Sequence, residues 1–474
     1  MRIVLIALTL CAAGCAMTPP AARKPALREA APVVASALTS AASPWPTAAW
    51  WRAYQDPTLD ALVMRAFEGS PGIAAAEARV AAARQAAKLT GAALGPQVQA
   101  GADLSRQRLS DNGLISPQFL GFNDYNQADL GVELRYSFDW WGKQKAQIQA
   151  SIDEARAKEA ESAAARLVLA AAVSDAYFGW QADQQRLVYA RERLDAMQRL
   201  AQVMERRVEA QLDNADTLRM TTYGLATARE NILSLEGSAR QRVVTLAALT
   251  GVPIDALPAL APRPLPRVAA GLPADLSLGL LGHRPDVVAS RWRVDAASQG
   301  LIEARAAWYP DISLRALVGL STVDLGKLLQ TNSANPSIGA AVNLPLFDGG
   351  QRVARHGLRS AQLDAAIATY DDAVLGAVRE VSATATLAGT LAAQRHEREA
   401  QLAANESLLA SAKSRVAAGT GDIRPQLLAA LQVNTTEDSL AQVDLAALSA
   451  DIGLRRALGG GYHATQAVTT ENAP

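Results

Sequence analysis

The chain has 474 residues with 46 basic and 46 acidic side chains, and this balance gives no support to a nucleic-acid partner. Half of the residues are hydrophobic but only 5% are aromatic, and much of the apolar content is alanine, which favours closely packed helices over a wide globular core. No run approaches the roughly 18 apolar residues of a transmembrane helix. Length alone suggests about three domains, whereas the periodicity of the chain favours one elongated body.

The N-terminus resembles a secretory signal, with Arg2 followed by an apolar run and small residues before Cys15. Small residues before a cysteine resemble a lipobox, whose cysteine is lipidated and becomes the mature N-terminus. We expect a signal peptide over residues 1–14, a lipid anchor with palmitate at Cys15, and a tether over residues 15–47. The alternative is an ordinary signal peptide with incidental cysteines. Cys11 and Cys15 are the only cysteines, so acylation would leave no thiol for redox chemistry.

Residues 48–251 combine predicted helices with a β-hairpin. Apolar and polar residues alternate from Gln127 to Phe138, and a second alternating stretch starts at Val98, which predicts a hairpin over about residues 97–139. No proline then occurs until after Leu212, which predicts a long helix and a return helix over about residues 142–250. Apolar residues three and four apart form a heptad seam that only Asp183 interrupts: Val173, Ala176, Trp180, Leu187, Ala190, Leu194, Met197, Ala201, Met204 and Val208.

A proline-rich connector follows over residues 252–272, and the arrangement then recurs. Pro71, Arg79 and Val80 return as Pro285, Arg293 and Val294, Phe138-Asp139 returns as Phe347-Asp348, and Arg207-Val208 returns as Arg415-Val416. We interpret this as an internal duplication that gives two structural repeats. The second repeat, residues 273–461, has a predicted hairpin at about 311–347 and a helix pair at about 349–458. A loose tail over residues 462–474 follows.

The predicted strands suit a membrane. Each has about ten residues, the length that crosses a bilayer at a tilt, and each has one apolar and one polar face. Aromatic residues at the strand ends predict a girdle at one membrane boundary: Phe138, Trp140, Trp141, Trp308 and Tyr309. The alternative is packing between strand and helix, and both roles are compatible. Four strands cannot close a membrane barrel, so several copies must contribute to one barrel.

Six motifs along the mature chain occur in the order found in a known family. They are Trp51-x-x-Tyr54-x-Asp56-Pro57-x-Leu59, Leu246-Ala247-x-Leu249-x-Gly251, Arg284-Pro285-Asp286-Val287, Ala306-Ala307-x-x-Pro310-x-Ile312-Ser313-Leu314, Leu346-Phe347-Asp348-Gly349-Gly350 and Ala457-Leu458-Gly459-Gly460-Gly461. These motifs resemble the TolC-like outer-membrane efflux proteins. With the expected lipid anchor, the chain resembles the NodT/OprM-type lipoprotein branch.

The resemblance implies a fold and a function. The fold is that of an α+β membrane protein, a homotrimer with a 12-stranded outer-membrane β-barrel, four strands per chain, and a long periplasmic α-helical barrel. The function is passive conduction of small molecules to the outside. The implied partners are outer-membrane lipid, a periplasmic adaptor and an inner-membrane transporter of the resistance-nodulation-division (RND) type.

The family's two helix turns at the periplasmic tip contact the adaptor and close the channel. The resemblance assigns this role to Arg207, Gln211, Asp213, Asn214, Arg415, Gly419 and Asp422. The family glycine is kept as Gly419 but is replaced by Gln211 in the first turn, which we expect to be one residue shorter than the second. The family's inward aspartate is not carried over, because Leu428 or Ala429 occupies that region. Asp422 could take the place of that aspartate, but we prefer to interpret it as a solvated turn residue.

Three other classes of protein are alternatives to this interpretation. An enzyme is not expected, because His283, His356, His396 and His463 are scattered without metal-ligand spacing, and we predict no catalytic residue, metal or cofactor. A periplasmic coiled-coil scaffold would need a core to cover the apolar strand faces. A TolC-like export channel of a type I secretion system shares the fold and would differ only at the helix turns.

Overall fold

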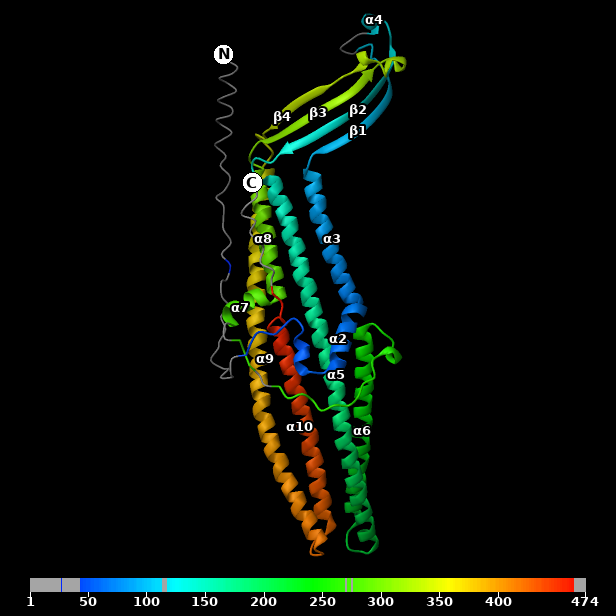
Figure 1. The fold of residues 1–474 in the computed structure, drawn as a ribbon, viewed down its shortest axis with the longest axis vertical. Coiled ribbons are helices and arrows are strands. Elements are labelled where there is room, and N and C mark those ends of the chain that lie inside the picture. The colour runs from blue at the N-terminus through cyan, green and yellow to red at the C-terminus, as the bar shows by residue number, and fades with distance from the viewer. Residues whose placement is uncertain (1–26, 28–42, 113–116, 269–270, 274–275, 464–474) are drawn as a thin grey trace. The chain divides into compact units, whose positions relative to one another are not determined.

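A computed structural model describes residue 27 and residues 43–112, 117–268, 271–273 and 276–463 (Figure 1). The expected signal peptide, the expected lipidation site Cys15 and most of the predicted C-terminal tail lie outside these residues. The chain divides into two compact units. The first unit, here called the sheet unit, consists of Met1–Leu27, Arg79–Lys158 and Ser290–Tyr370. The second, here called the helical unit, consists of Arg28–Ala78, Glu159–Ala289 and Asp371–Pro474.

The same order of elements occurs twice along the chain. The first series is α3 (Pro71–Leu94), β1 (Gln97–Arg108), β2 (Asp124–Phe138), α5 (Lys143–Glu209) and α6 (Ala215–Thr250). The second is α8 (Pro285–Ala306), β3 (Asp311–Thr322), β4 (Ser337–Asn343), α9 (Gln351–Ala417) and α10 (Ile423–Ala457). Both α5 and α9 have 67 residues, and α9 begins 208 positions after α5.

Shorter elements complete the fold. They are η2 (Trp50–Tyr54), α2 (Pro57–Gly69), α4 (Pro117–Leu120), η3 (Ile254–Ala256), α7 (Leu276–His283), η4 (Leu325–Lys327) and η5 (Thr331–Ser333). Among the residues that the structure describes, no helix combines the length and the apolar character needed to cross a membrane.

An aspartate starts each of the two long helices. The Asp139 carboxylate accepts hydrogen bonds from the backbone N–H groups of Gln144 (3.0 Å) and Lys145 (2.7 Å). The Asp348 carboxylate accepts from the backbone N–H groups of Gly350 and Arg352, both at 3.1 Å. These bonds satisfy amides that have no partner within the helix. The aspartates that follow Phe138 and Phe347 therefore set the first turns of α5 and α9.

The sheet unit is built on one antiparallel sheet in the order β1-β2-β3-β4. Four strands and a mostly helical chain were expected, and both are confirmed. The second predicted hairpin reached about residue 347, but β4 ends at Asn343, because Pro345 has no N–H group for the ladder. Strands β1 and β4 form the two edges, and within the described part of the chain each has one side without a strand partner.

The helical unit has its largest core where the N-terminal motif meets α5 and α10. The Tyr54 hydroxyl donates to the Asp451 carboxylate at 2.6 Å, and Asp451 also accepts from Arg455 Nε at 2.7 Å. Asp56 caps α2 through the backbone N–H of Thr58 and accepts from the Tyr177 hydroxyl at 2.7 Å. The motif residues therefore attach the start of the fold to two helices that lie far away in the sequence.

The seam of α5 is buried along much of its length. Six of its predicted apolar positions are buried, namely Val173, Ala176, Trp180, Leu187, Ala190 and Met204. Asp183, the interruption, is only 2% exposed and accepts from Ser238 Oγ and Arg242 Nε, both at 2.8 Å. A Cβ atom at Gly179 would lie 2.1 Å from the Arg242 guanidinium, so this glycine provides the space for the ion pair.

The three glycines at the end of the last motif stand where backbones touch. Gly459, Gly460 and Gly461 all have positive φ angles. A Cβ atom at Gly459 would lie 1.9 Å from the His283 carbonyl oxygen, and one at Gly461 would lie 2.0 Å from the Thr47 carbonyl carbon. Only glycine combines this conformation with this close approach.

Candidate functional site

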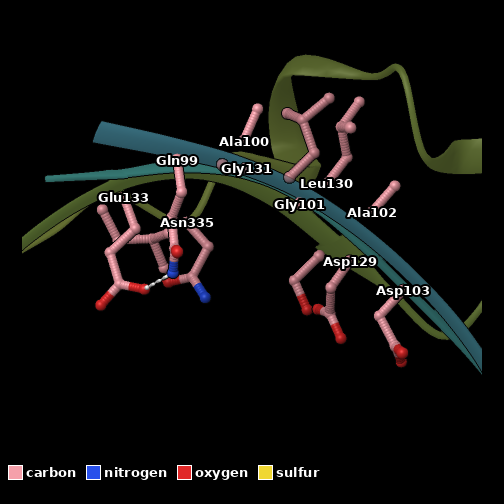
Figure 2. A pocket seen from close by; sticks show the side chains of 14 residues that line it. Gln99, Ala100, Gly101, Ala102, Asp103, Asp129, Leu130, Gly131, Glu133 and Asn335 are labelled. Carbon is pink, nitrogen blue, oxygen red and sulfur yellow. Dashed lines mark hydrogen bonds between the residues drawn. The ribbon is translucent and has the colours of Figure 1, made fainter. Parts of the chain in front are cut away.

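The first candidate site is the sheet, whose two faces differ in chemistry. Its register aligns Gln99 with Glu133 and Asp103 with Asp129, and these polar side chains project to one side. Figure 2 shows Ala100, Ala102 and Leu130 on the opposite side of the same strands. The period of two along each strand thus becomes one polar and one apolar face.

The apolar face is largely uncovered in a single chain. Val318 is 70% exposed and Ile338 is 79% exposed, and Val98, Leu104 and Val342 are similarly open. Soluble monomers rarely expose contiguous apolar surface of this kind. This face of the sheet therefore requires an apolar environment.

The polar face carries charges that are paired across strands. Glu133 accepts from Arg135 Nε at 2.7 Å and from Gln99 Nε2 at 3.3 Å, and Arg315 Nε lies 3.2 Å away. Gly101, Gly131 and Gly319 stand in register beside these groups and add no side chains. The result is a shallow pocket of about 320 Å³ that is open to water.

The predicted aromatic girdle lies where the strands meet the helices. The rings of Trp141 and Tyr309 stack at 4.6 Å, and Trp141 Nε1 donates to the Pro310 carbonyl at 2.9 Å. Trp140 is 67% exposed and packs beside Phe138 at 6.2 Å. The structure thus pairs Trp141 with Tyr309 and Trp140 with Phe138.

Trp308 differs from the other members of the predicted girdle. It is half-buried, and the Arg352 guanidinium lies 5.1 Å from its ring centre. This matches the packing alternative for Trp308. Sequence reasoning missed Tyr136, whose ring contacts Phe138 at 4.9 Å and extends the aromatic cluster along β2. The alternation of β2 places Tyr136 on the face of Phe138, and this signal was available in the sequence.

The second candidate site consists of the two turns that end the long helices. The first turn spans residues 210–214 and the second spans residues 418–422, so each has five residues. The expectation that the first turn is one residue shorter is therefore wrong. Both turns close in the same way, since the Leu212 amide donates to the Arg207 carbonyl (2.8 Å) and the Thr420 amide donates to the Arg415 carbonyl (3.1 Å).

This closure requires a left-handed residue in each turn. Gly419 has φ +68° and Gln211 has φ +59°, so glutamine adopts the conformation that glycine adopts more easily. Asn214 and Asp422 then cap the return helices through the backbone amides of Thr217 and Arg424. Their places as turn residues follow from the sequence, whereas the conformation of Gln211 does not.

Charged side chains join the two turns. Asp213 accepts from Arg207 Nε at 2.5 Å and lies 3.7 Å from Arg424 Nη1. Arg424 also pairs with Asp422 at 2.6 Å, and this pairing holds the pKa of the Asp422 carboxyl below its usual range. At the turns, sequence reasoning missed Arg424 as a functional candidate. Its position two residues after a capping aspartate gives no hint that it reaches the other turn.

Comparisons with known proteins find relatives over most of the chain. A family described as outer membrane efflux protein matches residues 62–252 and 278–460. The multidrug resistance outer membrane protein MdtP of Escherichia coli (strain K12) is 32% identical over 432 residues, which cover 90% of this chain and 88% of the relative. The putative multidrug resistance outer membrane protein MdtQ of Shigella flexneri is 29% identical over 475 residues, which cover 96% and 97%.

Solved structures share the fold. The outer membrane protein VceC of Vibrio cholerae matches with a TM-score of 0.79 and 28% identity, covering 88% of this chain and all of VceC. The outer-membrane channel OprN matches with a TM-score of 0.83 and 26% identity, covering 94% of this chain and 99% of OprN. The chain therefore shares the fold of solved outer-membrane channels.

Proposed function

The chain belongs to the outer membrane efflux protein family, and we therefore propose that it is the exit channel of a tripartite pump. It is an outer-membrane channel of an efflux system. Its partners would be a periplasmic adaptor and an inner-membrane RND transporter. The observation that carries the proposal is the sheet with one uncovered apolar face, one polar face and two free edges.

The free edges support a closed assembly of three copies. Open strand edges are not tolerated in lipid, and β1 and β4 each offer one edge per chain. Pairing β4 of one copy with β1 of the next would close a ring of 12 strands in a trimer. The equal lengths of α5 and α9 support the internal duplication that makes each chain two similar halves of such a ring.

The transported molecules would be small and diverse. MdtP and MdtQ are named as multidrug resistance proteins, which favours drug-like molecules over the protein export of a type I system. A water-filled barrel with polar side chains conducts passively, so the transporter would supply the energy. The chain itself would form part of the channel wall and of the gate.

The membrane placement rests on the anchor and the aromatic cluster. Lipidation at Cys15 would hold the mature N-terminus in the outer membrane. Trp140, Trp141 and Tyr309 would lie at the periplasmic boundary of the barrel, where amphipathic rings are favoured. Trp308 would pack beside this girdle through its contact with Arg352.

The helix turns would form the gate and the adaptor contact. The contacting residues would be Arg207, Gln211, Asp213, Asn214, Arg415, Gly419 and Asp422. The ion pair between Asp213 and Arg424 would hold the two turns of one chain together in the closed state. Adaptor binding would open the channel by replacing this contact with its own.

The test combines fractionation with transport. The full chain and a Cys15→Ala variant are expressed in a host that lacks its own channel of this class, with a radioactive fatty acid as label. We expect labelled, heat-resistant trimers in the outer membrane, loss of the label in the variant, and lower dye accumulation when a cognate pump is present. A soluble periplasmic protein would contradict the channel. An unlabelled protein in the outer membrane would contradict the lipid anchor alone.

A further inference from the structure

We propose that α6 of one chain packs on α9 of a second copy in the register that α10 adopts on α5 within one chain. Tyr223 and Leu408 would meet at the centre of this contact. The proposal rests on the trimer proposed above and names the residues that hold neighbouring copies together in the helical unit.

The contact of α5 with α10 within one chain provides the template. Leu200 of α5 lies in a buried cluster with Leu427 and Leu431 of α10. Further along, Arg186 Nε of α5 donates to the Asp438 carboxylate of α10 at 2.7 Å. The residue numbers rise along one helix as they fall along the other, so the two helices are antiparallel and these contacts define one register.

The two halves of the chain relate this template to a second pair of helices. Helix α9 begins 208 positions after α5, and α10 begins 208 positions after α6. Leu200 therefore corresponds to Leu408 of α9, and Leu431 corresponds to Tyr223 of α6. In an antiparallel pair, the residue number rises along one helix as it falls along the other. Adding 208 to the number on one helix and subtracting 208 from the number on the other therefore gives a pair in the same register.

The corresponding apolar side chains have no such partner among the residues that the structure describes. Leu408 is 63% exposed and Tyr223 is 75% exposed, whereas Leu200 and Leu431 are buried. One pair of helices thus buries its contact within the chain, and the equivalent pair leaves both halves open. Burying two large apolar side chains together is favourable, since each removes apolar surface from water.

The polar part of the template keeps one hydrogen-bond donor and one carboxylate acceptor. Arg186 corresponds to Gln394, and Asp438 corresponds to Glu230, and both counterparts are exposed. The amide of Gln394 can donate to the carboxylate of Glu230, as Arg186 donates to Asp438. The match is not complete, because Leu427 corresponds to Arg219, which pairs with Asp216. The apolar contact is therefore centred on Tyr223 and Leu408.

A second copy of the same chain is the occupant that fits these faces. Each chain carries one α6 face and one α9 face that complement each other, and such head-to-tail contacts form a ring when the rotation closes. The unpaired edges of β1 and β4 in the sheet unit repeat this logic. A partner of different chemistry would not explain why both halves of one known contact are open on the same chain.

Disulfide trapping tests the register. Full-length chains carrying Leu408→Cys with one tag and Tyr223→Cys with another tag are co-expressed, and outer membranes are treated with a mild oxidant. Each chain has only one introduced thiol, so a product with both tags links two chains. The matched control replaces Tyr223→Cys by Leu233→Cys, an exposed position ten residues further along α6, roughly 15 Å away by helical rise. A chain with both Leu200→Cys and Leu431→Cys should close within itself.

We expect at least a tenfold excess of the doubly tagged product for the Tyr223 pair over the Leu233 pair. Equal yields from the two pairs, in membranes where native gels show intact trimers, would overturn this register and leave the proposed channel standing. If the unsubstituted protein forms no trimer, the proposed function fails and this inference fails with it.

Discussion

Asp183 shows at the residue scale how one polar side chain specifies a contact in an alanine-rich bundle. It interrupts an apolar seam, and burial of a carboxylate is unfavourable without partners. The structure supplies Ser238, Arg242 and the space above Gly179. Apolar residues would let α5 and α6 slide along each other, whereas this ion pair fits only one register.

Removing Asp183 should therefore destabilise the protein strongly. We expect Asp183→Ala to lower the free energy of unfolding by about 1–3 kcal/mol, because the side chains of Ser238 and Arg242 lose their hydrogen-bond acceptor. Urea denaturation followed by the helical circular dichroism signal measures this. Asp195→Ala removes a solvent-exposed pair with Arg199 and should cost less than about 1 kcal/mol. Equal losses in the two variants would contradict the role given to Asp183.

Glu437 provides a prediction about pH. Its carboxyl is partly buried on α10, and burial, followed by the charges of Glu192 and Glu406, raises its pKa. The folded chain therefore holds the Glu437 proton more tightly than the unfolded chain does. The ionised carboxylate lowers the free energy of unfolding above the raised pKa. This loss of stability is absent below the ordinary glutamate pKa of about 4.3. We expect Glu437→Gln to stabilise the protein at neutral pH and to have no effect below that ordinary value.

The midpoint of thermal unfolding is measured for the unsubstituted protein and the variant, at neutral pH and below the ordinary glutamate pKa. Glu397→Gln, which changes an exposed carboxyl on α9, is the matched control and should shift neither midpoint. An increase of the same size at both pH values would show that Glu437→Gln acts through packing and not through the proton.

At the scale of elements, the two faces of the sheet make opposite demands on the same substitution. Arginine on the lipid side of a membrane strand costs about 2–4 kcal/mol near the midplane, whereas a polar lumen tolerates it. We expect the double variant Leu130→Arg and Leu134→Arg to yield no heat-resistant trimers. Gln99→Arg, on the opposite face of the same sheet, should assemble normally. Normal trimers from the double variant would contradict the membrane placement of the sheet.

Local patterns explain which elements sequence reasoning could predict. Alternation along β2 and the absence of proline along α5 depend only on neighbours in the chain, and both elements formed as expected. The end of β4 depended on a single proline. The contact of Tyr54 with Asp451 joins residues 397 positions apart. The periodicity of neighbouring residues does not predict such a pair.

The candidate sites follow the same division. The aromatic cluster and the capping residues of the turns were visible because they stand at element boundaries. The left-handed Gln211 was not visible, because glutamine has no preference for that conformation. Arg424 was missed because its bond to Asp213 crosses between two turns that are distant in sequence.

For the whole molecule, transport and assembly should separate when a turn is altered. We expect a bulky insertion after Asp213 to abolish efflux, because it disrupts the contact with Arg424 and the surface offered to an adaptor. Trimers should still reach the outer membrane. The same insertion after Gln330, in the loop between β3 and β4, is the control and should leave drug resistance intact. Unaltered resistance in the Asp213 variant would contradict the role of the turns.

The equal lengths of α5 and α9 limit how such a chain can change over evolutionary time. The helices start after strands whose ends are neighbours, since Phe138 and Val342 both pair with Ile312. They end at turns that touch through Asp213 and Arg424. One residue inserted into a single helix would rotate everything beyond it by about 100° and advance it by about 1.5 Å, which separates the turns. Side chains can drift apart between the two halves, as Gln211 and Gly419 have done, but insertions and deletions within these helices would survive only in matched pairs.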